Sequence, residues 1–177
     1  MIVGNGKHID IYSYEGEIKS KVELDSTFGE ITNFNTLHNF LLVTCGNNFF
    51  GIYDIIRRNF KQILTFRRFE KNGKLIGEIR DVSINSRATC VGILCDQMAN
   101  SELRIPETKF YIYDCENDFF YDYEISSNRI PIEILWDYND SRLFGVQTEY
   151  AKDISEINSE LTSEDVKKGI FTALLFF

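Results

Sequence analysis

The hydrophobic run Phe49-Phe50-Gly51-Ile52-Tyr53-Asp54 decides how this 177-residue sequence is interpreted, because its last three residues return in related form elsewhere. Ile11-Tyr12-Ser13 and Ile112-Tyr113-Asp114 also close short hydrophobic runs. Runs rich in aromatic and β-branched residues and bounded by turn residues are typical of β-strands linked by tight turns. Helical periodicity is almost absent. The sequence therefore predicts a β protein built from a repeated unit.

The spacing of these tripeptides indicates the size of the unit. Ile11 and Ile52 lie 41 residues apart, which is within the roughly 40–45 residues of a WD-type propeller blade. Ile52 and Ile112 lie 60 residues apart, and we assign the excess to the polar segment Asp96–Thr108 and the charged segment Glu70–Lys74. We therefore expect an all-β fold of consecutive four-stranded antiparallel blades of a WD-repeat β-propeller.

A second repeated pattern places an apolar residue and an Asn or Asp before a turn. It occurs at Phe34-Asn35, Ile84-Asn85 and Trp136-Asp137. Another apolar residue follows seven positions after the first member of each pair, at Leu41, Val91 and Leu143. An alignment without gaps puts each pair at the end of the first strand of a blade. On this alignment Trp136 packs between blades rather than against a ligand.

These repeats predict the organisation of the whole chain. We expect residues 1–177 to be part of a single WD-repeat propeller domain with roughly four blades, the first and last incomplete, at approximately 1–24, 30–68, 78–124 and 130–177. An acidic loop is expected at 151–169, where Ser155, Ser159 and Ser163 precede acidic residues and are either phosphorylation sites or part of a solvated loop. Because incomplete blades leave strand edges unpaired, we expect the natural polypeptide to continue beyond both ends.

Composition limits the classes of partner that this chain can bind. A formal net charge of -8 disfavours nucleic acid, whose binding depends mainly on Lys and Arg. No apolar run reaches the roughly 20 residues that a spanning helix needs, so at most peripheral membrane contact is expected. The four cysteines lie in strand-like runs, where a free thiol behaves as a small buried hydrophobe, and a reducing setting is expected.

Residues suited to catalysis or metal binding are scarce. Cys90 and Cys95 are five apart, which puts them on opposite faces of a strand. His8 and His38 are the two histidines, and neither belongs to a metal motif. Gly4-Asn5-Gly6 is followed by another strand, which favours a hairpin over a phosphate-binding loop. We therefore expect no enzyme activity and no catalytic, cofactor-binding or metal-binding residues, and no cofactor.

A group of basic residues around the fourth strand of the second blade is a possible contact for a partner protein. It stands out on an acidic chain, and Arg pairs well with carboxylates and phosphates at interfaces. The plainer interpretation is a set of scattered, solvated turn residues. The basic patch comprises Arg57, Arg58, Lys61, Arg67, Arg68 and Lys71.

Three stretches resemble the end of the propeller region in the intraflagellar transport protein 140 family. They are Arg80-Asp81-Val82-Ser83 through Lys109-Phe110-Tyr111-Ile112-Tyr113-Asp114, then Ile130-Pro131-Ile132-Glu133-Ile134-Leu135-Trp136-Asp137, then Ser141-Arg142-Leu143-Phe144-Gly145-Val146. The resemblance is specific over roughly Glu78–Phe177, and before that only the blade pattern carries over. The helical repeats that follow the propellers in that family are absent from this sequence, as a fragment would show.

The resemblance implies a core subunit of intraflagellar transport complex A, which acts in retrograde ciliary transport and in the entry of membrane proteins into cilia. It implies a non-enzymatic scaffold whose partners are other complex A subunits and cargo adaptors. The implied location is the cilium, the ciliary base and the cytoplasm. The residues alone leave open an unrelated cytosolic WD-repeat adaptor and, less favoured, a propeller enzyme with a site in its channel.

Overall fold

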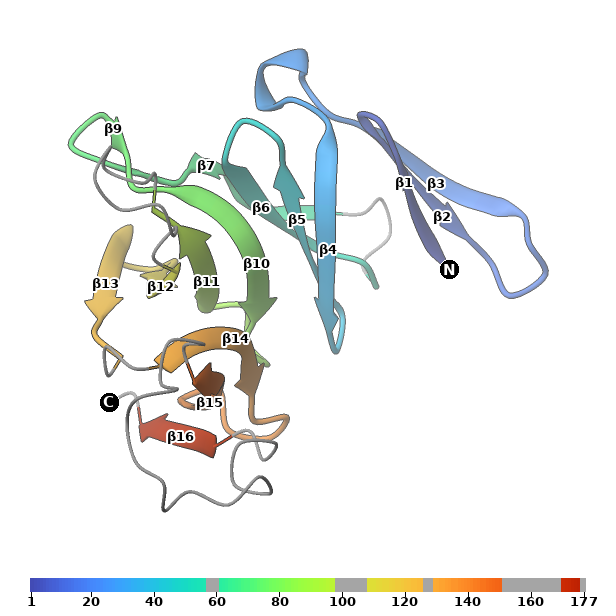
Figure 1. Cartoon of the computed structure of the whole chain (residues 1–177). Helices are drawn as coiled ribbons and strands as arrows, with labels where there is room; N and C mark the ends of the chain where they lie inside the picture. Colours follow the sequence, from blue (N-terminus) through green and yellow to red (C-terminus); the bar gives the residue numbers. More distant parts are fainter. Residues whose placement is uncertain (57–60, 98–107, 126–128, 151–169, 176–177) are drawn as a thin grey trace. The chain divides into compact units, whose positions relative to one another are not determined.

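The computed structural model describes residues 1–56, 61–97, 108–125, 129–150 and 170–175. In these residues strands follow one another in antiparallel sheets, each in chain order (Figure 1). The helical element among them is a short 3-10 turn, Ser26–Phe28. None of the described helical structure has the length and apolar character needed to cross a bilayer. The prediction of an all-β fold made of consecutive antiparallel sheets is confirmed.

The chain divides into two compact units, and the first comprises Met1–Leu75. Its first sheet contains β1 (Ile2–Asn5), β2 (His8–Tyr12) and β3 (Ile18–Glu23). Its second sheet contains β4 (Ile31–Leu37), β5 (Phe40–Cys45), β6 (Phe49–Asp54) and β7 (Lys61–Arg68). A small hairpin of β8 (Glu70–Lys71) and β9 (Lys74–Leu75) follows. Gly4-Asn5-Gly6 leads into a hairpin, as predicted, because β2 pairs directly with β1.

Turn residues explain why these strands reverse. Asn48 adopts a φ of 59° at the end of the three-residue turn between β5 and β6, a conformation that Asn tolerates better than most residues. Asn72 and Gly73 have φ values of 54° and 73° between β8 and β9, as a type I′ turn requires.

One hydrophobic cluster joins the two larger sheets of the first unit. Ile9 comes from β2, and Leu41, Val43 and Tyr53 come from the second sheet. Gly4 permits the close approach, because a Cβ atom there would lie 2.7 Å from the Phe34 ring. Burial of such side chains is the main stabilising contribution to a fold of this kind.

The second unit comprises Ile76–Phe177 and also contains two sheets. The first holds β10 (Glu78–Ile84), β11 (Cys90–Asp96), β12 (Thr108–Asp114) and β13 (Phe119–Tyr123). The second holds β14 (Arg129–Trp136), β15 (Leu143–Tyr150) and β16 (Ile170–Leu175). Leu94, Phe110 and Ile112 pack in one cluster with Ile134, Phe144 and Val146. The expected acidic loop at 151–169, with its three serines, lies outside the described residues.

A bulge near the start of β4, β10 and β14 corrects the alignment of the second repeat. The register shifts between Ile31 and Asn33, between Ile79 and Asp81, and between Pro131 and Glu133. When the strands are matched at their bulges, Phe34 corresponds to Val82 and Ile134. The gap-free alignment with Ile84 and Trp136 is therefore wrong by two residues at Phe34. The bulges themselves carry no clear signal in the sequence, because an extra residue in a strand needs no particular side chain.

Candidate protein-binding surface

The third residue of each repeated tripeptide caps a turn. Asp54 Oδ1 accepts a hydrogen bond from Ile56 N at 3.1 Å. Asp114 Oδ1 accepts from Glu116 N at 2.9 Å and from Asn117 N at 3.1 Å. These side chains replace backbone partners that the turn lacks, which explains why Asp or Ser returns after each Ile-Tyr pair. The repeat therefore has a structural role.

Asn85 links two neighbouring turns of the second unit. Its Oδ1 accepts hydrogen bonds from Thr89 N at 2.9 Å and Cys90 N at 3.1 Å, which closes the turn between β10 and β11. Its Nδ2 donates to the Ser141 carbonyl oxygen at 2.9 Å, in the turn between β14 and β15. Asn85 is 1% exposed, so these bonds are shielded from water. The side chain holds the two turns together.

Trp136 packs between the two sheets of the second unit, as predicted. It lies at the end of β14, and its Nε1 donates a hydrogen bond to Ser83 Oγ on β10 at 3.1 Å. Its ring centroid is 5.0 Å from that of Phe144. The indole therefore gains both apolar contact and a hydrogen-bond partner.

Arg80 is the extra residue of the bulge in β10, and it forms a second link between the same sheets. Its Nη2 donates to the Pro131 carbonyl oxygen on β14 at 2.5 Å. Its Nη1 lies 3.3 Å from Thr108 Oγ1 and 4.0 Å from Asp96 Oδ1. A bulge redirects a side chain out of the regular alternation. Here it directs a guanidinium towards the neighbouring sheet.

A polar pocket of about 480 Å³ lies beside the turns that Asn85 joins. It is lined by Arg87, Asn139, Asp140, Ser141 and Arg142. Arg142 Nε and Nη2 donate to the two carboxylate oxygens of Asp140 at 3.2 and 3.3 Å. The hydrogen bond from the Arg142 side chain is the main cause that lowers the pKa of the Asp140 carboxyl, and the nearby charge of Arg87 lowers it further. Sequence analysis did not identify this group, because its members come from two separate turns.

The basic patch divides along β7. Lys61 opens the strand opposite Asp54, whereas Arg67 and Arg68 close it opposite Phe50 and Phe49. Lys71 follows on β8. The structure therefore brings Arg67, Arg68 and Lys71 to one end of the strand and leaves Lys61 at the other. Arg57 and Arg58 lie outside the described residues.

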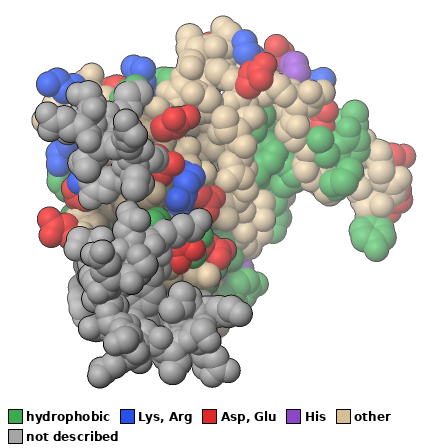
Figure 2. All heavy atoms as spheres, in the orientation of Figure 1, with side chains coloured by type: hydrophobic (Ala, Val, Ile, Leu, Met, Phe, Trp, Pro, Cys, Tyr) green, Lys and Arg blue, Asp and Glu red, His purple; other side chains and the backbone are tan. Residues whose placement is uncertain are grey.

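Arg68 already has partners at its end of β7. Its Nη1 lies 3.6 Å from Glu70 Oε2, and its guanidinium lies 5.9 Å from the centre of the Phe49 ring. On the face that Figure 2 shows, basic and acidic side chains are interspersed rather than gathered by sign. Exposed pairs of this kind contribute little to stability, so the side chains can exchange partners at low cost.

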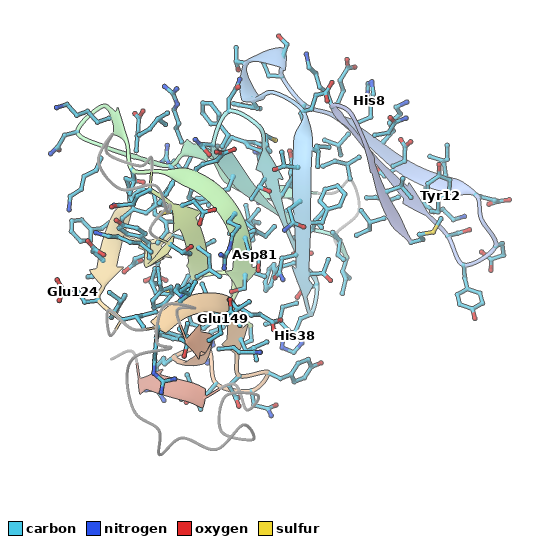
Figure 3. All side chains as sticks on the ribbon, in the orientation of Figure 1. His8, Tyr12, His38, Asp81, Glu124 and Glu149 are labelled. Atoms are coloured by element: carbon cyan, nitrogen blue, oxygen red, sulfur yellow. The ribbon has the colours of Figure 1, made fainter. Side chains whose placement is uncertain are left out.

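The thiols and histidines have structural surroundings. Burial raises the pKa of Cys90 to about 11 and that of Cys95 to about 12, which disfavours the reactive thiolate. His8 on β2 and His38 in the turn after β4 lie apart in Figure 3. Among the residues that the structure describes, no three His, Cys, Asp or Glu side chains gather as a metal site would require.

Comparison with protein families identifies the relationship. The family model described as the IFT140 second beta-propeller matches residues 1–126. The chain belongs to the IFT140 second beta-propeller family. The match includes all strands from β1 to β13 of this IFT140 propeller segment. It therefore includes the sheets of the first unit, where the sequence alone showed only a blade pattern. No curated protein matches the chain.

Two solved structures resemble this IFT140 propeller segment at low sequence identity. The tricorn protease is similar with a TM-score of 0.55 and 15% identity, over 83% of this chain and 14% of that chain. A structure of the mitotic checkpoint complex has a TM-score of 0.42 and 10% identity, over 84% of this chain and 54% of that chain. The chain thus spans about one seventh of the tricorn protease. At such identity the likeness to the tricorn protease concerns the fold alone.

Proposed function

We propose that this IFT140 propeller segment is a non-enzymatic scaffold of intraflagellar transport complex A. In this role it mediates protein-protein contacts in retrograde ciliary transport and in the entry of membrane proteins into cilia. The observation that carries the proposal is the family match over residues 1–126. Antiparallel sheets with capped turns support it, because binding residues are most often displayed on loops that a rigid framework holds in place.

The proposal extends to partners and location. The partners are the other complex A subunits and cargo adaptors, with at most peripheral membrane contact and no nucleic acid. The protein acts at the cilium, the ciliary base and in the cytoplasm. We treat residues 1–177 as part of one WD-repeat propeller domain in which the four sheets of three or four strands are blades.

The experiment that tests this function is affinity purification of the tagged chain from ciliated cells, with mass spectrometry of the recovered proteins. We expect other complex A subunits to be enriched, and the tagged chain to be found at the ciliary base and in the cilium by microscopy. An unrelated WD-repeat propeller of similar size, tagged in the same way, is the control. If complex A subunits are recovered no better than with that control, the proposed function is wrong.

The basic patch is proposed as one of the contact surfaces. Arg67, Arg68 and Lys71 are exposed at one end of β7 and β8, where guanidinium groups can meet carboxylates of a partner. Changing Arg57, Arg58, Arg67 and Arg68 to Glu is expected to reduce the recovery of at least one complex A subunit. Recovery at the wild-type level for every subunit would exclude the patch.

A further inference from the structure

We propose that the polar pocket beside the β10–β11 and β14–β15 turns binds an acidic peptide segment of a partner protein, through the guanidinium groups of Arg87 and Arg142. The proposal rests on the scaffold function proposed above and specifies the chemistry of one of its partners. It uses residues that neither the basic patch nor the repeated motifs include. Four observations support it: the types of residue that line the pocket, the hydrogen bonds that hold its turns, the net charge of the lining side chains and the acidic character of the whole chain.

The residues that line the pocket are polar or charged. All five lining residues have polar or charged side chains, and the volume of about 480 Å³ is within the range of roughly 300–1,000 Å³ for ligand sites. An apolar ligand would gain little here, because it would displace water from polar groups without replacing their hydrogen bonds. The pocket therefore suits a charged or strongly polar group.

The turns that carry the lining residues are held in place before any partner binds. Asn85 Nδ2 donates to the Ser141 carbonyl oxygen at 2.9 Å, which joins the two turns. Within the second turn, Asp137 Oδ1 accepts from Asn139 N at 2.8 Å and from Asp140 N at 2.7 Å. A site with fixed walls loses less conformational entropy on binding than a flexible loop does. This turn can therefore bind a short segment without first becoming ordered.

The charges of the lining side chains favour an anion of low charge. Arg87 forms no hydrogen bond or ion pair with the part of the chain that the structure describes, and Arg142 uses its Nε and Nη2 on Asp140. Because a guanidinium has five N–H groups, Arg142 retains donors for a second acceptor. Among the residues that line the pocket, two guanidinium groups and one carboxylate leave a single positive charge. That charge matches one carboxylate of a peptide better than a doubly charged phosphate.

The acidic character of the chain favours a peptide over an extended anionic surface as the occupant of the pocket. Membranes and nucleic acids attract proteins through broad basic regions. This chain has a formal net charge of -8, and Figure 2 shows acidic side chains among the basic ones on the face drawn. A peptide presents one or two acidic side chains to a small site and does not require a broad basic face. An acidic peptide is therefore the occupant that the charges allow.

Fluorescence anisotropy of a labelled hexaglutamate peptide with the complete chain tests the proposal. Arg87→Glu is expected to weaken binding by about tenfold or more, the loss expected for a charge-assisted contact. Lys74→Glu is the matched control, since Lys74 is exposed on β9 and its replacement changes the net charge equally. We expect this control to bind within about twofold of the wild type. Both variants should unfold at the wild-type temperature, because both side chains are exposed.

A second variant tests the charge count in the opposite direction. Asp140→Asn preserves an oxygen that can accept from Arg142 N, which lies 2.9 Å from Asp140 Oδ1, but it removes the competing carboxylate. The affinity for hexaglutamate should rise. A fall in affinity, equal losses in Arg87→Glu and Lys74→Glu, or no binding by the wild type would each overturn the proposal. So would tighter binding, through Arg87, of inorganic phosphate, a phosphoserine peptide or vesicles that contain phosphatidylserine.

The two proposals fail in different ways. If the chain recovers complex A subunits but does not bind hexaglutamate, the pocket is wrong and the scaffold function stands. If hexaglutamate binds through Arg87 while no complex A subunit is recovered, the proposed function is wrong and the peptide site stands.

Discussion

Gly92 shows how one residue fixes the distance between two sheets. It lies on β11, and a Cβ atom there would be 2.9 Å from the Ile134 side chain on β14 and 3.0 Å from Ser83 Oγ. Contacts this short force a neighbour to move. Ser83 Oγ also accepts the hydrogen bond from Trp136 Nε1, so a shift of Ser83 would disturb a second contact between the sheets.

Gly92→Ala is therefore expected to destabilise the protein although it adds only one methyl group. Overpacking of this kind costs about 1–3 kcal/mol of the free energy of unfolding. Urea unfolding followed by far-UV circular dichroism, which reports on the strands of both units, measures the loss. Gly46→Ala is the control, because the nearest atom to its Cβ would lie at 3.7 Å and little change is expected. An equal effect in both variants would show that glycine flexibility rather than packing matters.

The elements of this fold were predictable from sequence where a local pattern determines them. Ile52-Tyr53-Asp54 and its relatives mark strands that end in a capped turn, because both the strand and the cap depend on adjacent residues. The bulges were not predicted, since Arg80 and Ile132 look like ordinary strand residues. For that reason Phe34 was aligned two residues away from its structural equivalents.

The candidate sites show the same limit. The basic patch joined residues close in sequence, yet Lys61 and Arg68 lie at opposite ends of β7. The pocket joins Arg87 and Arg142, which are far apart in sequence and meet only because two turns lie side by side. Contacts between elements depend on tertiary packing, which strand periodicity does not specify.

Asn85 provides a test of how turns from neighbouring sheets are joined. Asn85→Ala leaves Thr89 N, Cys90 N and the Ser141 carbonyl oxygen without their partner, at a cost of about 1–3 kcal/mol in the free energy of unfolding. Asn85→Asp retains the acceptor that caps its own turn and loses the donor to Ser141. If the link between the turns matters, the Asp variant should also be destabilised. Wild-type values in the Asp variant would show that only the cap matters.

At the scale of the whole molecule, buried and partly buried thiols connect stability to pH. Both units contain them. Burial is the first cause in every case, and it raises the pKa of the thiol from 9.0 to about 12 for Cys45, Cys95 and Cys115 and to about 11 for Cys90. In the unfolded chain the same groups ionise near their ordinary value. The folded protein therefore holds these protons at a pH where the unfolded chain has lost them.

The sign of the pH dependence follows from this difference. Between about pH 9 and pH 12 the unfolded state binds fewer protons, so the free energy of unfolding falls as the pH rises. Well below pH 9 the thiols contribute almost no pH dependence, because they are protonated in both the folded and the unfolded state. Urea unfolding at pH 8 and pH 10 should show this fall in the free energy of unfolding. Cys115→Ala should make the fall smaller, because one thiol no longer contributes. It should not abolish the fall, because the other thiols, the lysines and the tyrosines still titrate. If the variant loses stability with pH as steeply as the wild type, Cys115 is not protected by the fold, and the packing around the turn after β12 is looser than its burial implies.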